Sequence, residues 1–288
     1  MALPTPAPAT RPEPTEVNIL TSADPLPASV ASFDRWRTGL AQRNLYTVSG
    51  NTWPVDCVTD PETLKDDLSE DLGGITEFVP FTIYTHHGCE GRVDVEAYRS
   101  EALAVLDQQT SFQIAKELWT GATSGNPSLQ STANDLTGFI GSVGIRDAAA
   151  ILIAAFETYT KGAKATLHVP QGSLYELADA LFITRQGNRL VTPNGHVVIA
   201  GPGYPSDYTC GPTGSDPITD GQCYLYVTGC VEVAAHTNVV LGSEENFGGA
   251  YARQNLVEFY AERMAIYRFP TVPVFALRAN TAWYTPPT

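Results

Sequence analysis

Residues 93–119 contain neither glycine nor proline, and their apolar side chains recur at spacings compatible with three to four residues. That spacing places apolar side chains on one face of an α-helix. A helix of about 26 residues rises 1.5 Å per residue and is therefore roughly 40 Å long. Gly121 follows directly as a stop signal. The apolar face of this predicted helix consists of Val95, Tyr98, Ala102, Leu106, Ile114 and Leu118.

Two further segments predict a helix and a strand in the middle of the chain. Residues 148–159 carry an apolar stripe at helical spacing, and Gly162 is placed to end that helix. Residues 164–169 predict a strand, which Pro170 closes.

Ser173 and Glu176 have the spacing of a capping box. In that motif the serine side chain accepts a hydrogen bond from the third helical amide, and the glutamate bonds back to the first residue of the motif. The pair therefore predicts a helix that continues to about Phe182.

Asn194 and Gly195 lie between two apolar runs, residues 189–191 and 196–200. An Asn-Gly pair between two apolar runs is the strongest short-range signal for a β-hairpin. Together with the preceding elements, the hairpin predicts a compact α/β lobe.

Three apolar segments follow this lobe. Residues 224–227 and 231–234 predict strands. Residues 256–268 alternate apolar and polar side chains before Pro270 and Pro273, and helix and strand compete there.

The first 30 residues contain seven prolines. Proline removes amide donors and favours extended conformations over a helix or a central strand. This segment is therefore predicted to be an arm and not a domain. It is either a disordered tail or an extended arm that becomes ordered by lying across neighbouring copies.

Residues 44–84 place short apolar groups between glycines, prolines and acid clusters, and they predict a long protruding loop or an irregular hairpin. Between Asp56 and Glu77, eight acids and one base give a local charge of −7. This acidic segment is either a solvated loop or a docking surface for a basic patch on a partner or on a second copy. The candidate subunit-interface residues are Asp56, Asp60, Glu62, Lys65, Asp66, Asp67, Glu70 and Asp71.

The chain of 288 residues has a formal charge of −14 and only 4 lysines. Affinity for a phosphate backbone comes mostly from clustered Lys and Arg, so sequence-specific nucleic-acid binding is not expected. No apolar run approaches the roughly 20 residues that cross a bilayer, and no signal peptide is visible after Met1. Neither membrane insertion nor secretion is expected.

The five cysteines are an odd number without C-x-x-C spacing, which argues against a zinc ribbon and against a disulfide-dense scaffold. Reduced thiols are therefore expected. Cys210 and Cys223 bracket a loop rich in Gly, Pro and Asp, and they are the one pair that would bridge in an oxidising medium.

Residues 86–90 (HHGCE) form the densest group of potential metal ligands, but structural zinc needs four ligands with paired spacing. A nucleophile pair of Cys89 and His87 is equally disfavoured, because catalytic partners normally come from separate elements. No phosphate-binding glycine motif and no G-x-S-x-G elbow is present. The sequence predicts no catalytic, cofactor-binding or metal-binding residues, and an enzyme is the weaker class.

The predicted elements run in the order extended arm, acidic loop, long helix, α/β lobe and closing strands. This order resembles the tailed-phage major capsid proteins with the Hong Kong 97-like fold, which is an α+β fold. The resemblance covers most of the chain from about residue 44. It is carried by residues 78–84 (FVPFTIY), 115–121 (AKELWTG), 165–170 (ATLHVP), 192–198 (TPNGHVV), 201–205 (GPGYP) and 224–229 (YLYVTG).

The resemblance implies that residues 256–268 form a strand and that the acidic segment lies over a neighbouring subunit. Some family members cross-link covalently through Lys, Asn and a nearby acid. Here Lys65 is the only lysine of the loop, and no matching asparagine is identified. The implied parts are an N-terminal arm (1–48), an E-loop (49–92), a P-domain spine helix (93–137), an A-domain (138–225) and late P-domain strands (226–288).

The resemblance implies a structural protein whose hexamers and pentamers form an icosahedral shell around double-stranded DNA in the virion, assembled in the host cytoplasm. Its expected partners are further copies, a portal, scaffolding or decoration proteins, and DNA bound without sequence specificity, with no membrane and no cofactor. No long charged N-terminal helix that could serve as a fused scaffold is present. An encapsulin-like cargo shell is the alternative with the same fold, and a soluble α/β hydrolytic enzyme is the alternative from another class.

Overall fold

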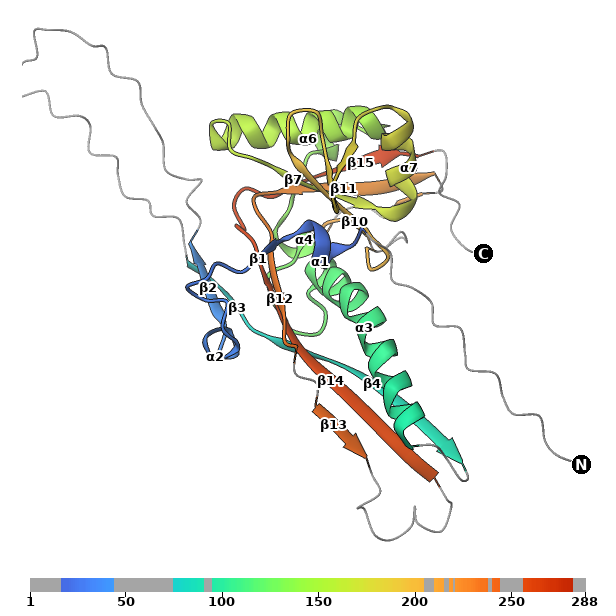
Figure 1. Ribbon diagram of the computed structural model, residues 1–288. Helices are drawn as coiled ribbons and strands as arrows, with labels where there is room; N and C mark the ends of the chain where they lie inside the picture. Colours follow the sequence, from blue (N-terminus) through green and yellow to red (C-terminus); the bar gives the residue numbers. More distant parts are fainter. Residues whose placement is uncertain are drawn as a thin grey trace, which may run out of the picture.

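The computed structural model describes residues 17–43, 75–90, 95–204, 210–214, 218–219, 221–237, 240–243 and 256–281. These residues form an elongated molecule with two parts (Figure 1). One part is a lobe around an eight-stranded sheet, and the other is a long, narrow layer made of a five-stranded sheet and one long helix.

Seven helices and fifteen strands lie in the described residues. None of these helices combines the length and the hydropathy that crossing a bilayer requires. The helices are α1 (Ile19–Ser22), α2 (Phe33–Trp36), α3 (Val95–Thr120), α4 (Leu129–Thr132), α5 (Thr137–Ile140), α6 (Ile145–Thr160) and α7 (Gln171–Asp179). The strands are β1 (Asp24–Pro25), β2 (Leu40–Arg43), β3 (Ile75–Phe78), β4 (Phe81–Glu90), β5 (Asn134–Asp135), β6 (Val143–Gly144), β7 (Thr166–Pro170), β8 (Thr184–Gln186), β9 (Arg189–Val191), β10 (Val197–Gly201), β11 (Gln222–Thr228), β12 (Glu232–Ala235), β13 (Val240–Ser243), β14 (Leu256–Arg268) and β15 (Phe275–Asn280).

The long sheet is built around β14. Its order is β1-β12-β14-β13, and β4 also pairs with β14. β14 and β4 are antiparallel from Leu256 opposite Glu90 to Ala265 opposite Phe81. Residues 256–268 therefore form one strand of 13 residues, which confirms the strand that the resemblance implied.

The predicted long helix is confirmed as α3, which spans 26 residues and lies beside β4 and β14 (Figure 1). Its apolar face packs into a core cluster with side chains of β4, β11 and β14. Burial of this face holds the helix on the sheet, because most helical stability in proteins comes from tertiary packing. The fully buried residues of this face include Ala102, Leu106, Ile114 and Leu118.

A buried carboxylate holds the turn that ends α3. Glu117 is 4% exposed and accepts hydrogen bonds of 2.6–3.1 Å from the amides of Thr123 and Ser124 and from the Ser124 hydroxyl. Gly121 stops the helix with a φ of +63°, and a Cβ atom there would lie 2.5 Å from the Asn126 carbonyl oxygen. The predicted glycine stop is therefore confirmed by the backbone geometry.

The lobe contains the sheet β5-β15-β11-β7-β10-β9-β8, with β6 paired to β15. α6 and α7 cover one face of this sheet (Figure 1). Ala148, Leu152 and Phe156 of α6 are fully buried against it. These contacts confirm the predicted α/β lobe.

Local signals in the lobe were also correct. α6 ends at Thr160, and Lys161 and Gly162 then take φ angles of 59° and 93°. β9 and β10 form the predicted antiparallel hairpin, in which Gly195 has a φ of +83°. The strands predicted before Pro170 and over residues 224–227 and 231–234 are β7, β11 and β12.

The capping box predicted from Ser173 and Glu176 is wrong. α7 begins directly after Pro170, so Ser173 lies inside the first turn and no side chain caps the helix. The Ser173 hydroxyl instead forms a 3.2 Å hydrogen bond with the thiol of Cys223 on the neighbouring sheet. α7 also ends before the predicted end at Phe182.

Residues 17–43 pack onto their own chain. Ile19 and Trp36 are 1% and 2% exposed, and Trp36 shares a small core with Leu26, Leu40 and Ile266 of β14. For residues 17–30 the structure contradicts the disordered-tail alternative, because apolar side chains such as Ile19 and Leu26 are buried against the chain's own core. Residues 1–16, which hold most of the prolines, lie outside the described residues.

Candidate functional site

The acidic segment leaves and re-enters the fold at one place. Residues 44–74 connect β2 to β3, and these strands pair antiparallel from Leu40 opposite Phe78 to Arg43 opposite Ile75. Residues 44–74 therefore begin and end at the same pair of antiparallel strands, β2 and β3. The candidate interface residues themselves lie outside the described residues: Asp56, Asp60, Glu62, Lys65, Asp66, Asp67, Glu70 and Asp71.

Asn126 ties the strand after this hairpin to the end of α3. Its Oδ1 accepts from the Val79 amide at 2.7 Å, and its Nδ2 donates to the Val79 carbonyl at 2.8 Å. The side chain is only 5% exposed. Since both of its polar groups are satisfied by one backbone residue, Asn126 fixes where β3 turns into β4.

Residues 86–90, the group of potential metal ligands that the sequence analysis disfavoured as a metal site, lie on β4. Of its residues, the described side chain is that of His86, whose ring stacks on Tyr260 at a centroid distance of 4.8 Å. Among the described residues, no three His, Cys, Asp or Glu side chains come together as a metal site. The side chains of His87, Cys89 and Glu90 lie outside the described residues.

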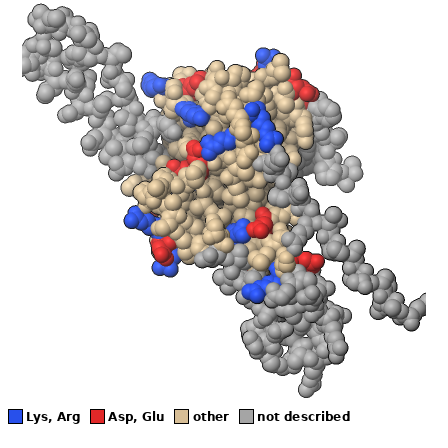
Figure 2. Space-filling model, viewed as in Figure 1, with Lys and Arg blue, Asp and Glu red and all other residues tan. Residues whose placement is uncertain are grey.

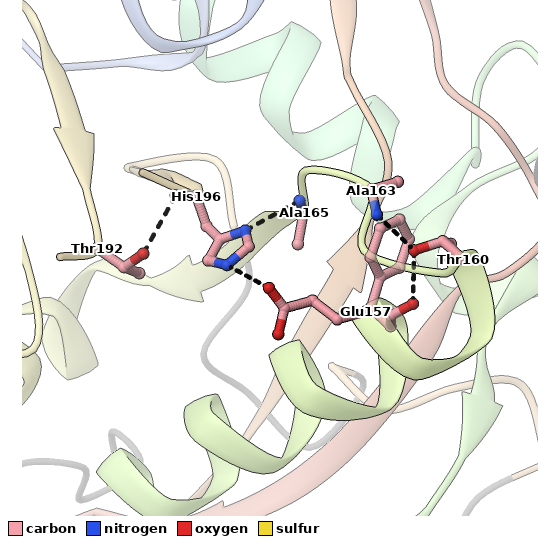
Figure 3. Close-up of polar contacts among 7 residues, drawn as sticks. Glu157, Thr160, Ala163, Ala165, Thr192 and His196 are labelled. Atoms are coloured by element: carbon pink, nitrogen blue, oxygen red, sulfur yellow. Dashed lines mark hydrogen bonds and ion pairs between the residues drawn. The ribbon is translucent and has the colours of Figure 1, made fainter. Parts of the chain in front are cut away.

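His196 and Glu157 line a cavity of about 370 Å³ between α6 and the β9–β10 turn. Nδ1 of His196 accepts from the Ala165 amide at 3.1 Å, and Nε2 lies 3.1 Å from Glu157 Oε1 (Figure 3). The Glu157 contact lacks the alignment of a hydrogen bond. No serine or cysteine is among the described residues that line this cavity. The pair joins the residue before β10 to α6. Thr192 also lines the cavity, and its hydroxyl accepts from the His196 backbone amide at 3.2 Å.

His168 is fully buried at the centre of the lobe sheet, between Tyr204 and Thr228. The Thr228 hydroxyl donates to the Gly229 carbonyl, so its oxygen accepts from Nε2–H of His168. The Tyr204 hydroxyl then donates to Nδ1, at 2.8 Å. This network assigns a neutral imidazole, and burial lowers the pKa of His168 to about 3.

Cys210 and Cys223, the pair considered for a disulfide, are free and buried in the structure. Burial raises the pKa of the Cys223 thiol to about 12. Cys230 donates to Asp24 Oδ2 at 2.9 Å, and burial raises its thiol pKa to about 12 as well. Thiols that stay protonated are poor nucleophiles, so Cys223 and Cys230 are suited to packing and hydrogen bonding.

Charged side chains are dispersed over the surface. On the face in Figure 2, the described Lys and Arg side chains stand singly or in small groups, and Asp and Glu lie beside several of them. This part of the face has no continuous basic track of the kind that follows a phosphate backbone.

Two apolar residues that the sequence analysis missed are among the most exposed in the described part of the chain. Phe139 is 90% exposed on α5, and Leu181 is 82% exposed with a φ of 55°. Gly138 lies in the same short helix as Phe139 and Gly141 follows that helix, so an apolar residue within a glycine-rich turn is the signal that would have found it. Large apolar side chains at such exposure mark candidate contact surfaces.

No protein-family model matches this chain, and no curated protein matches its sequence. Solved structures do match it. The capsid of an empty GTA particle aligns at a TM-score of 0.56 and 11% identity, over 98% of this chain and 96% of that chain. A structure of Microbacterium phage Oxtober96 aligns at 0.54 and 13% identity, over 97% of this chain and 96% of that chain.

The chain has the Hong Kong 97-like capsid fold. A structure of Mycobacterium phage Ogopogo also aligns, at a TM-score of 0.50 and 10% identity, over 96% of this chain and 97% of that chain. The capsid fold therefore spans this chain almost from end to end, and the predicted α+β fold class is confirmed.

The division of the capsid fold into the parts 1–48, 49–92, 93–137, 138–225 and 226–288 stays a prediction. The strands of the last range divide between the two sheets, because β12, β13 and β14 lie in the long sheet and β15 pairs with β11 in the lobe.

Proposed function

We propose that this chain is a major capsid protein whose hexamers and pentamers close into an icosahedral shell around double-stranded DNA. The observation that carries the proposal is a capsid fold aligned over almost the full length of both chains. The elongated shape adds support, since a long sheet with a 26-residue helix offers broad lateral surfaces for neighbouring copies. The virion is then the site of the protein, and assembly takes place in the host cytoplasm.

The proposed partners follow from this role. Further copies supply the lateral contacts, a portal replaces one capsomer, and scaffolding or decoration proteins act during or after closure. Packaged DNA needs confinement and not tight binding, which agrees with a formal charge of −14.

Electron microscopy of the purified full chain, alone and with its neighbouring assembly proteins, tests the proposal. Closed icosahedral shells are expected. Monomers or small closed oligomers under all of these conditions would refute it. The contents separate the encapsulin-like alternative, because a phage head encloses DNA and a cargo shell encloses protein.

We further propose that the acidic segment docks on a neighbouring subunit. Neutralising Asp66, Asp67, Glu70 and Asp71 together is expected to weaken shells, and more so at low salt, because exposed charges are screened beyond about 8 Å at physiological ionic strength. Thermal disassembly of shells at two salt concentrations measures the effect.

A control variant neutralises Asp147 and Asp179, two exposed acids of the lobe. It removes two negative charges where the four-residue variant removes four, so the two effects are compared per charge removed. Equal disassembly temperatures of the wild-type and the four-residue variant at both salt concentrations would contradict the docking role.

A further inference from the structure

A polar cavity of about 430 Å³ opens at the edge of the lobe sheet. It lies where β5, the start of α5 and the loop at residues 212–214 meet strands β11 and β15. The polar and charged side chains in its wall belong to Asn134, Asp135, Thr137, Thr213, Tyr224 and Arg278.

The one acid among these residues is already engaged. Asp135 Oδ1 accepts from the Thr137 amide at 2.8 Å, and Oδ2 accepts from the Tyr224 hydroxyl at 2.9 Å. These bonds hold the carboxylate against the turn that starts α5.

Arg278 is not engaged in the same way. Its backbone amide donates to the Thr137 hydroxyl at 3.0 Å, but its guanidinium makes no ion pair with the described residues. Its Nε atom is buried, and no hydrogen-bond acceptor reaches it. A buried donor without a partner is rare in folded proteins, because it has lost its water and gained nothing in return.

A second observation lies at the same place. Thr137 and Gly138 line the cavity and belong to α5, whose next residue is Phe139. Phe139 is 90% exposed and Ile140 is 40% exposed, so α5 presents apolar side chains that the described part of the chain leaves uncovered. An arginine with an unpaired buried Nε and an exposed aromatic side chain on the adjoining short helix have the composition of an interface centre, where Arg and aromatic residues are enriched.

We propose that α5 and the Arg278 cavity form a contact between two copies of this chain, in which a carboxylate of the second copy enters the cavity and pairs with Arg278 while Phe139 becomes buried. The inference rests on the proposed function, which supplies many neighbouring copies. A second copy is a good source of the group, because the chain has 31 acids against 17 bases. Guanidinium and carboxylate match in geometry and form paired hydrogen bonds, so the contact would fix orientation as well as bind.

Substitution of Arg278 separates an interface role from a role in the subunit's own fold. Arg278→Gln is expected to leave the thermal unfolding of the unassembled subunit unchanged, because the guanidinium has no described partner to lose. Shell yield is expected to fall by at least about tenfold, because the same desolvated ion pair is lost at every copy in the shell. Arg185→Gln, at an exposed arginine of the lobe, is the matched control and is expected to assemble normally.

Photo-cross-linking gives a readout that does not depend on yield. A benzophenone amino acid in place of Phe139 is expected to cross-link to a second copy in assembled shells and not in unassembled subunits. The same group in place of Tyr175, another exposed aromatic of the lobe, controls for chance encounters.

Wild-type shells are the reference for both experiments. If the wild-type chain forms no shells, the proposed function fails. If it forms shells, but Arg278→Gln assembles equally well and position 139 gives no cross-link between copies, the capsid function stands and this contact is refuted. A subunit destabilised by Arg278→Gln would also overturn the inference, because Arg278 would then act within its own chain.

Discussion

Lowering the pH from 7.5 to 5 should destabilise the lobe through His168. The folded chain keeps this imidazole neutral, with a pKa of about 3, because burial disfavours the charged ring. The unfolded chain exposes the ring, which then titrates near 6.5. The unfolded state therefore takes up a proton first, so the stability is fully present above pH 6.5 and falls as the pH drops towards 3.

The magnitude follows from the distance between pH 5 and the unfolded pKa. The difference is about 1.5 pH units, and each unit corresponds to about 1.4 kcal/mol. Protonation of His168 in the unfolded chain should therefore lower the free energy of unfolding by about 2 kcal/mol at pH 5. The structure shows why the folded site resists protonation. A charged ring would donate from both nitrogens, and the Tyr204 hydroxyl that now donates to Nδ1 would have to give its hydrogen to another acceptor.

Urea unfolding of the unassembled subunit at several pH values measures this dependence. His168→Gln has no titrating ring at this site, so its stability should fall less between pH 7.5 and 5, by about 2 kcal/mol, whatever its stability at neutral pH. NMR of ¹³C-labelled histidine in the wild-type chain provides a second measurement that needs no variant. A His168 resonance that titrates between pH 8 and 5 in the folded chain, or equal pH slopes for the two proteins, would refute the reasoning.

Three further substitutions probe the packing of α3. Gly203→Ala should lower the free energy of unfolding by about 1–3 kcal/mol, because a Cβ atom there would lie 2.3 Å from a backbone oxygen of α3. In the control Gly172→Ala the new Cβ atom meets nothing within 4 Å, so this variant should be neutral or stabilising in thermal unfolding. Leu106→Asp buries a carboxylate and should yield insoluble or non-assembling protein. The control Val105→Asp changes a neighbouring residue that is 40% exposed, and it should remain soluble. A soluble, assembling Leu106→Asp variant would contradict the packing of this helix face. Glu117→Gln weakens the charge-assisted hydrogen bonds to the turn after α3 and should lower the free energy of unfolding by about 1–3 kcal/mol. An unchanged midpoint of urea unfolding would contradict this expectation.

Elements stabilised within a few residues of sequence were predictable. α3 and α6 follow from apolar side chains three to four residues apart, and Gly121 and Gly162 end them because glycine adopts positive φ at little cost. The β9–β10 hairpin follows from the Asn194-Gly195 signal, and in its turn Gly195 is the residue of this pair that adopts a positive φ.

Local sequence patterns gave a wrong prediction where a contact distant in sequence used the same side chain. Ser173 has the spacing of a capping residue, but the strand before it runs up to Pro170 and starts the helix earlier. Its hydroxyl then meets Cys223, which is 50 residues away in sequence. Residues 256–268 were undecided between helix and strand for a related reason, because their pairing with β4 joins segments about 170 residues apart.

The sequence by itself determined where the long helix, the hairpin and the glycine stops lie, and the order of its elements was enough to indicate a capsid fold. Only the tertiary structure decided that β15 returns to the lobe sheet beside β11 and that His168 is buried between Tyr204 and Thr228. It also decided that Arg278 lines a cavity with its Nε buried and without an acceptor in the described part of the chain. The physical reason is the separation along the sequence over which each kind of interaction acts. Backbone hydrogen bonds and φ preferences act between near neighbours, so they can be read from a short stretch of sequence. Sheet order, burial and the loss of a hydrogen-bond partner depend on residues that only the folded chain brings together.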